Sequence, residues 1–161
     1  MRNIYMSVDP YMRGGMLDGK LGVPLEGRCV GQVVQSNSAM VQVGEYVLGM
    51  LGWREYYVCA AKDVTAIDLS IAPMQSFVGA VGMPGHTAYV GLLDIGRPHE
   101  GETVFVSAAA GAVGSIVCQI AKIKGCRVVA SAGSDLKVAW LLEKAGVNAA
   151  FNYKNVDNIE D

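Results

Sequence analysis

The chain has 161 residues, of which 52% are hydrophobic and 17% are charged, and its formal net charge is −2. This composition can support a packed core and excludes an intrinsically disordered protein, which needs low hydrophobicity and a high net charge. The small net charge also excludes the broad basic surface on which binding to nucleic acids or anionic membranes depends.

Residues 1–13 carry charges and a proline where a signal peptide needs an apolar core, and no apolar run reaches the roughly 18 residues of a membrane span. The cysteines follow neither a zinc-ligand spacing nor a disulfide framework. They are Cys29, Cys59, Cys118 and Cys126. The sequence therefore predicts a cytoplasmic protein with reduced thiols and no bound metal, and with neither a membrane nor a nucleic-acid partner.

Short apolar runs separated by Gly, Pro and Asp fill residues 1–75. Runs of this kind predict short β-strands over 28–34, 45–50 and 55–59. Strands so short and so irregularly spaced indicate a barrel or a sandwich rather than a layered α/β sheet.

From residue 76 onward the pattern becomes helical. We expect a short helix over 76–81 and a turn over 83–85. The spacing of three apolar residues predicts a further helix over 86–95, which a following Gly and Pro end. The three apolar residues that share its face are Ala88, Leu92 and Ile95.

The last third of the chain alternates strands and helices. A continuous apolar run predicts a strand over 103–108 that is buried on both faces. A helix over 115–124, a strand over 127–132, a helix capped by Ser134 and a strand over 148–152 follow. The order is βαβαβ, which is one mononucleotide-binding half of a Rossmann fold.

The connection between the first strand and the first helix of this βαβαβ unit reads Ala109-x-Gly111-x-x-Gly114. It matches the G-x-G-x-x-G dinucleotide fingerprint with alanine in the first place. Gly111 would let a pyrophosphate approach the backbone, Gly114 would let the helix pack closely on the strand, and the helix N-terminus would offer free N–H groups to the anion. A tight turn with no ligand is the alternative interpretation.

The end of the second strand indicates which dinucleotide is bound. NAD-binding proteins usually place an acid there, about 20 residues after the glycine turn, to hold the ribose hydroxyls. Here the strand ends in Gly133 and Ser134, with Asp135 beyond the turn and Lys137 in the first helical turn. Small residues beside a cation suit a 2′-phosphate, which predicts NADP(H). An ordinary exposed lysine is the alternative for Lys137.

Four segments together resemble one enzyme family. They read RNIYMSVDPYMR over 2–13, GMPGHTAY over 82–89, AAAGAVG over 108–114 and FNYK over 151–154. With these segments the chain resembles the zinc-independent medium-chain dehydrogenase/reductases, in the branch of the prostaglandin reductases, alkenal double-bond reductases and curcumin reductases. The resemblance implies an α/β protein, with a partial GroES-like β-barrel catalytic domain over 1–80 and the first βαβαβ half of an NADP-binding Rossmann domain over 81–161.

The resemblance also implies an NADPH-dependent reduction of the C=C bond of small α,β-unsaturated ketones and aldehydes. Tyr11 and Met83 would lie near the substrate and the nicotinamide, although a tyrosine packed beside Pro10 and a core methionine are the alternatives. No catalytic residue is identified. Cofactor contacts would come from Gly111, Ala112, Val113, Gly114, Gly133, Ser134, Lys137 and Tyr153.

Two departures from the family's patterns carry further expectations. Zinc-dependent relatives have a Gly-His-Glu ligand motif where this chain reads Glu26-Gly27-Arg28, and we expect His86 and His99 to be surface or capping residues. The chain is also much shorter than a full family member. We therefore expect a truncated form that is poorly active alone, whose first Rossmann strand has an unpaired edge that favours association, for example as a homodimer.

Two other functions remain open at this point. One is a quinone oxidoreductase of the same superfamily, which would share the cofactor turn. The other is a non-catalytic remnant that binds a nucleotide weakly or binds only a protein partner.

Overall fold

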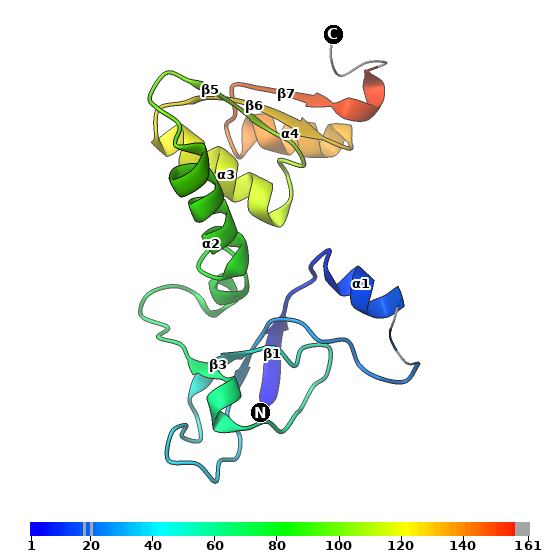
Figure 1. Cartoon of the computed structure of the whole chain (residues 1–161), viewed down its shortest axis with the longest axis vertical. Helices are drawn as coiled ribbons and strands as arrows, with labels where there is room; N and C mark the ends of the chain where they lie inside the picture. The colour runs from blue at the N-terminus through cyan, green and yellow to red at the C-terminus, as the bar shows by residue number, and fades with distance from the viewer. Residues whose placement is uncertain (18, 20, 157–161) are drawn as a thin grey trace. The chain divides into compact units, whose positions relative to one another are not determined.

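The computed structural model describes residues 1–17, 19 and 21–156, and the chain divides into two compact units, Met1–Gly82 and Met83–Asp161 (Figure 1). Each unit has its own β-sheet and its own apolar core, which gives a mixed α/β fold. Across the described residues, no helix is long and apolar enough to cross a membrane.

The first unit is built on a four-stranded antiparallel sheet. Its strands pair in the order β1-β2-β3-β4 and comprise Arg2–Met6, Cys29–Gln32, Tyr46–Gly49 and Thr65–Ala66. Valines supply its core, because Val33, Val41 and Val47 are buried against one another. Short helical segments accompany the sheet, namely α1 (Met12–Leu17), η1 (Ala61–Asp63) and η2 (Met74–Val78).

The predicted barrel does not close. In the described residues β1 and β4 are the two edges of an open sheet, and β2 and β3 are shorter than the strands predicted over 28–34 and 45–50. The strand predicted over 55–59 is wrong, because Tyr56 forms only an isolated bridge with Arg2. Single backbone hydrogen bonds, such as that from the Asn3 N–H to the Glu55 carbonyl at 2.8 Å, tie this segment to β1 without a ladder.

A long helical segment opens the second unit. Helix α2 (Met83–Tyr89) continues directly into the π-helical segment η3 (Val90–Gly96). The turn predicted over 83–85 is therefore wrong, because Pro84 lies in the first helical turn, where a missing N–H is tolerated. Ile95 is 78% exposed, since the wider π-turns rotate it away from the face that Ala88 and Leu92 bury.

The sheet of the second unit is parallel, with the order β5-β6-β7. Alternate strand residues pack against helices α3 and α4 on one face, where the core includes Val106, Val128 and Leu141. Figure 1 shows both helices on the same side of the strands. The bounds are Thr103–Val106 (β5), Ala112–Ile123 (α3), Arg127–Ala132 (β6), Asp135–Glu143 (α4) and Ala149–Asn152 (β7), followed by the turn η4 (Tyr153–Asn155).

The prediction that the first strand of this sheet is buried on both faces is wrong. Phe105 is 54% exposed on the face opposite the helices. Its ring stacks on Phe151 of β7, with the ring centroids 6.2 Å apart. The helices of the described residues cover one face of the sheet only, so the apolar run of β5 faces a packed core on one side and solvent on the other.

Candidate functional site

The turn between β5 and α3 is held by backbone hydrogen bonds. The N–H of Ala109 donates to the carbonyl of Ser131 on β6 at 3.0 Å, and the N–H of Gly111 donates to the carbonyl of Ala108 at 2.9 Å. Ala108 adopts the left-handed conformation with φ of 47°. These contacts fix the start of α3 at the carboxyl end of the parallel sheet.

The two glycines of this turn have different surroundings. A β-carbon on Gly114 would lie 2.5 Å from the Ala108 carbonyl oxygen and 2.8 Å from the Ala109 Cα, so only glycine lets α3 approach the turn this closely. Gly111 is exposed, and a β-carbon there would meet only the Ala108 oxygen, at 3.0 Å. Its φ of −83° suits any residue, so the backbone does not require glycine here. The lack of a side chain instead leaves the solvent side of the turn open.

The start of α3 presents free backbone donors. Gly111 is the N-cap residue and its position supplies no capping side chain. The first N–H that bonds back into the helix is that of Ser115, to the Gly111 carbonyl at 3.0 Å. The N–H groups of Ala112, Val113 and Gly114 precede it and have no acceptor within the helix, which is the arrangement that binds anions.

Four of the predicted residues lie at the ends of β6 and β7 and at the start of α4. A β-carbon on Gly133 would lie 2.8 Å from the Tyr153 hydroxyl, so this phenol rests directly against the Gly133 backbone. Ser134 is the N-cap residue of α4, but its hydroxyl makes no capping bond, which corrects the predicted side-chain cap. Lys137 is exposed one turn later, and its N–H donates to the Ser134 carbonyl at 3.1 Å. The residues form a polar corner, defined here as Gly133, Ser134, Lys137 and Tyr153.

Asp135 adds a feature beside this corner that the sequence analysis missed. Its Oδ1 accepts hydrogen bonds from the side-chain amides of Asn152 at 2.8 Å and Asn155 at 3.2 Å. The sequence analysis noted Asp135 only as an acid that lies beyond the end of the second strand. A contact between residues 17 and 20 positions apart has no signature in the periodicity of either element.

The two predicted substrate residues belong to different units. Tyr11 is half-exposed and lines a cavity of about 510 Å³ together with Met12, Val23 and Met50. Met83 is half-buried at the start of α2, where its sulfur accepts a hydrogen bond from the Thr87 hydroxyl at 3.4 Å.

The segment Glu26-Gly27-Arg28, where the sequence analysis noted the absence of a zinc-ligand motif, lies directly before β2. The methyl group of Met12 lies against Gly27, where the β-carbon of a larger residue would stand. Asp9, three residues before Met12, is also buried. Its Oδ2 has no hydrogen-bond partner in the described residues. No cluster of three His, Cys, Asp or Glu side chains able to hold a metal occurs in the part of the chain that the structure describes.

The histidines and cysteines belong neither to the glycine turn nor to the polar corner. His86 is exposed, and His99 is exposed with its Nδ1 3.7 Å from a carboxylate oxygen of Glu102. All four cysteines are free. Burial raises the pKa of the Cys29 and Cys118 thiols, so both are protonated at neutral pH and are poor nucleophiles.

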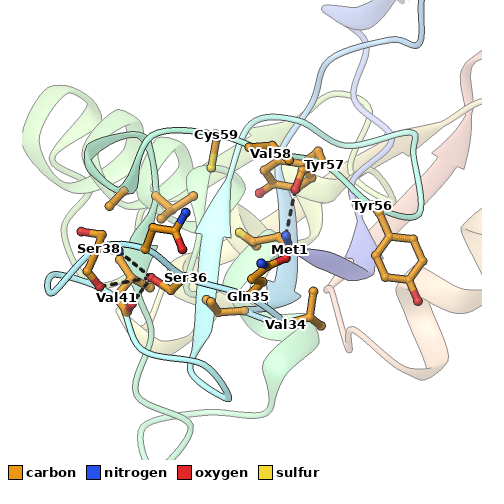
Figure 2. Close-up of a pocket in the computed structure, with 14 residues that line it drawn as sticks. Met1, Val34, Gln35, Ser36, Ser38, Val41, Tyr56, Tyr57, Val58 and Cys59 are labelled. Carbon is orange, nitrogen blue, oxygen red and sulfur yellow. Dashed lines mark hydrogen bonds between the residues drawn. The ribbon is translucent and has the colours of Figure 1, made fainter.

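A larger cavity of about 640 Å³ lies in the first unit (Figure 2). Two of its polar groups are paired locally: the Met1 ammonium donates to the Tyr57 carbonyl at 2.8 Å, and the Ser36 hydroxyl donates to the Val41 carbonyl at 2.6 Å. Cys59 lines it, with a thiol pKa that partial burial raises. The described residues that line it include none of the predicted site residues, so the cavity does not belong to the candidate site.

Two family models match the chain. The model for the N-terminal domain of oxidoreductases matches residues 1–67, and that for zinc-binding dehydrogenases matches residues 112–161. The second match covers α3, β6 and the polar corner.

Named relatives match nearly the whole chain. Prostaglandin reductase 1 of Mus musculus is 47% identical over 98% of this chain and 49% of its own length. The 2-alkenal reductase (NADP(+)-dependent) of Nicotiana tabacum is 43% identical over 99% of this chain and 49% of its own length. The crystal structure of CurA in complex with NADPH from Vibrio vulnificus superposes with a TM-score of 0.85 at 42% identity, covering 97% of this chain and 48% of CurA. The chain thus spans about half the length of the relatives it matches.

Proposed function

The chain belongs to the zinc-independent branch of the medium-chain dehydrogenase/reductases, and on this premise we propose that the protein is an NADPH-dependent reductase of the C=C bond of α,β-unsaturated ketones and aldehydes. The polar corner carries the proposal. No acid stands at Gly133 or Ser134, directly after β6, and a phenol and a lysine are available there to a 2′-phosphate.

We also propose the domain assignment that this activity needs. Residues 1–80 are part of a GroES-like catalytic domain, and residues 81–161 are the first half of a Rossmann domain. The parallel order β5-β6-β7, with the glycine turn at the carboxyl end of β5, supports the second assignment. The antiparallel sheet of the first unit is compatible with the first assignment.

The structure offers a fit for the cofactor's phosphates in two places. The N–H groups at the start of α3 would bind the pyrophosphate, and the exposed Gly111 leaves space for it to approach. The polar corner would hold the 2′-phosphate, with the Lys137 ammonium and the Tyr153 hydroxyl as donors. When bound, NADPH would supply the hydride that reduces the β-carbon of the acceptor.

The first unit would contribute the substrate contacts. Tyr11 lines the cavity of about 510 Å³, whose other walls are largely apolar, as a small alkenal or enone would require. Met83 would contact the nicotinamide side. The protein is proposed to work in the cytoplasm, as a homodimer, on a small-molecule substrate; four free cysteines fit a reducing compartment.

The test is product analysis with a simple 2-alkenal and NADPH, with the tobacco 2-alkenal reductase as positive control. We expect the saturated aldehyde, formed at the low rate that the sequence analysis predicts for this chain, with one NADPH consumed per C=C bond reduced and a still slower reaction with NADH. An allylic alcohol as product would contradict C=C reduction. Turnover of quinones without turnover of alkenals would favour the quinone oxidoreductase, and calorimetry that detects no NADPH binding would favour a non-catalytic remnant.

A further inference from the structure

The acid nearest to the polar corner is held by two amides. Asp135 directly follows Ser134 in the chain, and its Oδ1 accepts from Asn152 Nδ2 at 2.8 Å and from Asn155 Nδ2 at 3.2 Å. Both donors are neutral side chains. They satisfy one carboxylate oxygen of Asp135 without cancelling its charge, so their main effect is on where the carboxylate points.

The orientation of the Asn152 amide is itself fixed. Its Oδ1 accepts from the backbone N–H of Lys154 at 3.1 Å, as the N-cap of η4, so its NH₂ group is left to face Asp135. Reversing the amide would place two acceptor oxygens against each other. Asn152 and Asn155 stand before and after Tyr153 in the chain, so the two amides tie the carboxylate to the ends of the turn η4, whereas the Tyr153 hydroxyl lies against Gly133.

A carboxylate free to rotate at this position would be unfavourable for a 2′-phosphate. Asp135 is exposed and directly follows Ser134 in the chain, so its charge stands beside the proposed phosphate site. Like charges at short range disfavour one another, and an acid near the end of the second strand is the feature that favours a ribose hydroxyl over a phosphate. The protein thus keeps an acid near the corner and yet must prevent it from facing the ligand.

We propose that Asn152 and Asn155 are specificity-determining positioning residues that hold the Asp135 carboxylate away from the 2′-phosphate. The side chains of Asp135, Asn152 and Asn155 together are called the amide clamp. This inference rests on the proposed NADPH site, because it explains how a chain with an acid beside that site prefers the phosphorylated cofactor.

The experiment uses adenosine 2′,5′-bisphosphate and adenosine 5′-monophosphate, which carry the adenosine half of each cofactor alone. Their affinities for the full chain are measured by calorimetry at low and high salt. We expect N152A/N155A to lower the preference for the bisphosphate about tenfold, which corresponds to about 1.4 kcal/mol. The loss should be smaller at high salt, because salt screens the exposed carboxylate.

Charge and position are separated by adding Asp135→Asn. This change removes the charge while an acceptor oxygen remains for the amides, so D135N alone should keep the preference within about twofold. In the N152A/N155A background it should restore most of the lost preference. Failure to restore it would overturn the inference, as would an N152A/N155A variant with unchanged preference.

A matched control distinguishes positioning from general destabilisation. Asn148→Ala also removes a side-chain hydrogen bond of the second unit, from the Val128 N–H to Asn148 Oδ1 at 2.8 Å, just before β7. It should lower the unfolding midpoint but leave the preference unchanged. If the wild type itself shows no preference for the bisphosphate, the proposed NADPH site fails; if only the variants fail to change it, the amide clamp fails and the site stands.

Discussion

In the second unit the candidate site residues lie at the ends of elements that share one core, whereas in the first unit Tyr11 precedes a six-residue helix beside a cavity. Helix α3 has twelve residues and α4 has nine, and both bury apolar side chains against β6. The core of the first unit is built around Val33, Val41 and Val47.

This contrast concerns what fixes a site residue in space. At the polar corner and the glycine turn the backbone does so, through hydrogen bonds between β5, β6 and their turns and through glycines that leave no room for side chains. Around Tyr11 the side chains border open space. Substitutions should therefore be costly in the second unit and mild at matched positions in the first.

The largest expected effect is at the centre of the second unit's core. Leu141 on α4 is fully buried, so Leu141→Ala should reduce the free energy of unfolding by about 2–5 kcal/mol through lost contacts and a cavity. Leu136 on the same helix is 86% exposed, and Leu136→Ala should change the free energy of unfolding by less than about 0.5 kcal/mol. Urea denaturation measures both. Similar losses for the two variants would contradict the assigned core.

Two glycine-to-alanine changes compare the units directly. Gly114→Ala drives a β-carbon into the backbone of Ala108, and should cost about 1–3 kcal/mol of stability and weaken NADPH binding. A β-carbon on Gly15 in α1 would meet no atom within 4 Å, so Gly15→Ala should stabilise by about 0.5–1 kcal/mol. Thermal unfolding and calorimetry give the two readouts. A Gly114→Ala variant as stable as the wild type would refute the close approach of α3.

The same contrast explains which features the sequence could predict. The predicted bounds of β6 match the structure, and α3 differs from its predicted span by three residues at the start, because a buried strand and an amphipathic helix each impose a period on the sequence. Strand β1 was not predicted, since a bulge between Asn3 and Tyr5 breaks its alternation and its partner β2 lies far along the chain. The segment over 55–59 was predicted as a strand because its residues form a short apolar run. In the structure it pairs with β1 only through an isolated bridge, so no strand forms.

For the site, the sequence located the glycine turn and the residues of the polar corner but not the amide clamp. The turn is local, and its glycines form a spaced motif. The contact between Asp135 and Asn152 joins two elements that only the parallel pairing of β6 with β7 brings together. The predicted ligand contacts of the glycine turn and the polar corner, like those of Tyr11 and Met83, remain predictions.

A change at Lys137 tests the polar corner itself. One hydrogen bond to a charged group contributes roughly 1.5–3 kcal/mol, reduced by exposure, so Lys137→Ala should lower the preference for NADPH over NADH by about tenfold. Lys144→Ala, just beyond the last residue of α4, is the matched control and should leave the preference unchanged. Calorimetry with both cofactors measures it. A Lys137→Ala variant that keeps the wild-type preference would remove this lysine from the site.

The smallest effect appears only in alkaline solution and differs between the units. In the first unit, burial raises the pKa of Cys29, of Cys59 and, most strongly, of Tyr57; in the second, it raises that of Cys118. Below the ordinary pKa of these groups both the folded and unfolded states keep the proton. As the pH rises past that value the unfolded state loses protons first, so stability falls.

The first unit, with more such groups among the described residues, should therefore lose more stability in alkaline solution than the second. Each unit has one tryptophan, Trp53 in the first and Trp140 in the second, so Trp140→Phe and Trp53→Phe variants report each unit by fluorescence. Urea midpoints at neutral and alkaline pH should fall more steeply for the unit of Trp53. Adding Tyr57→Phe should flatten that fall, because it removes the most strongly shifted group and leaves the ring in place. An equal fall in both units, or one unaffected by Tyr57→Phe, would show that burial of these groups does not set the alkaline stability.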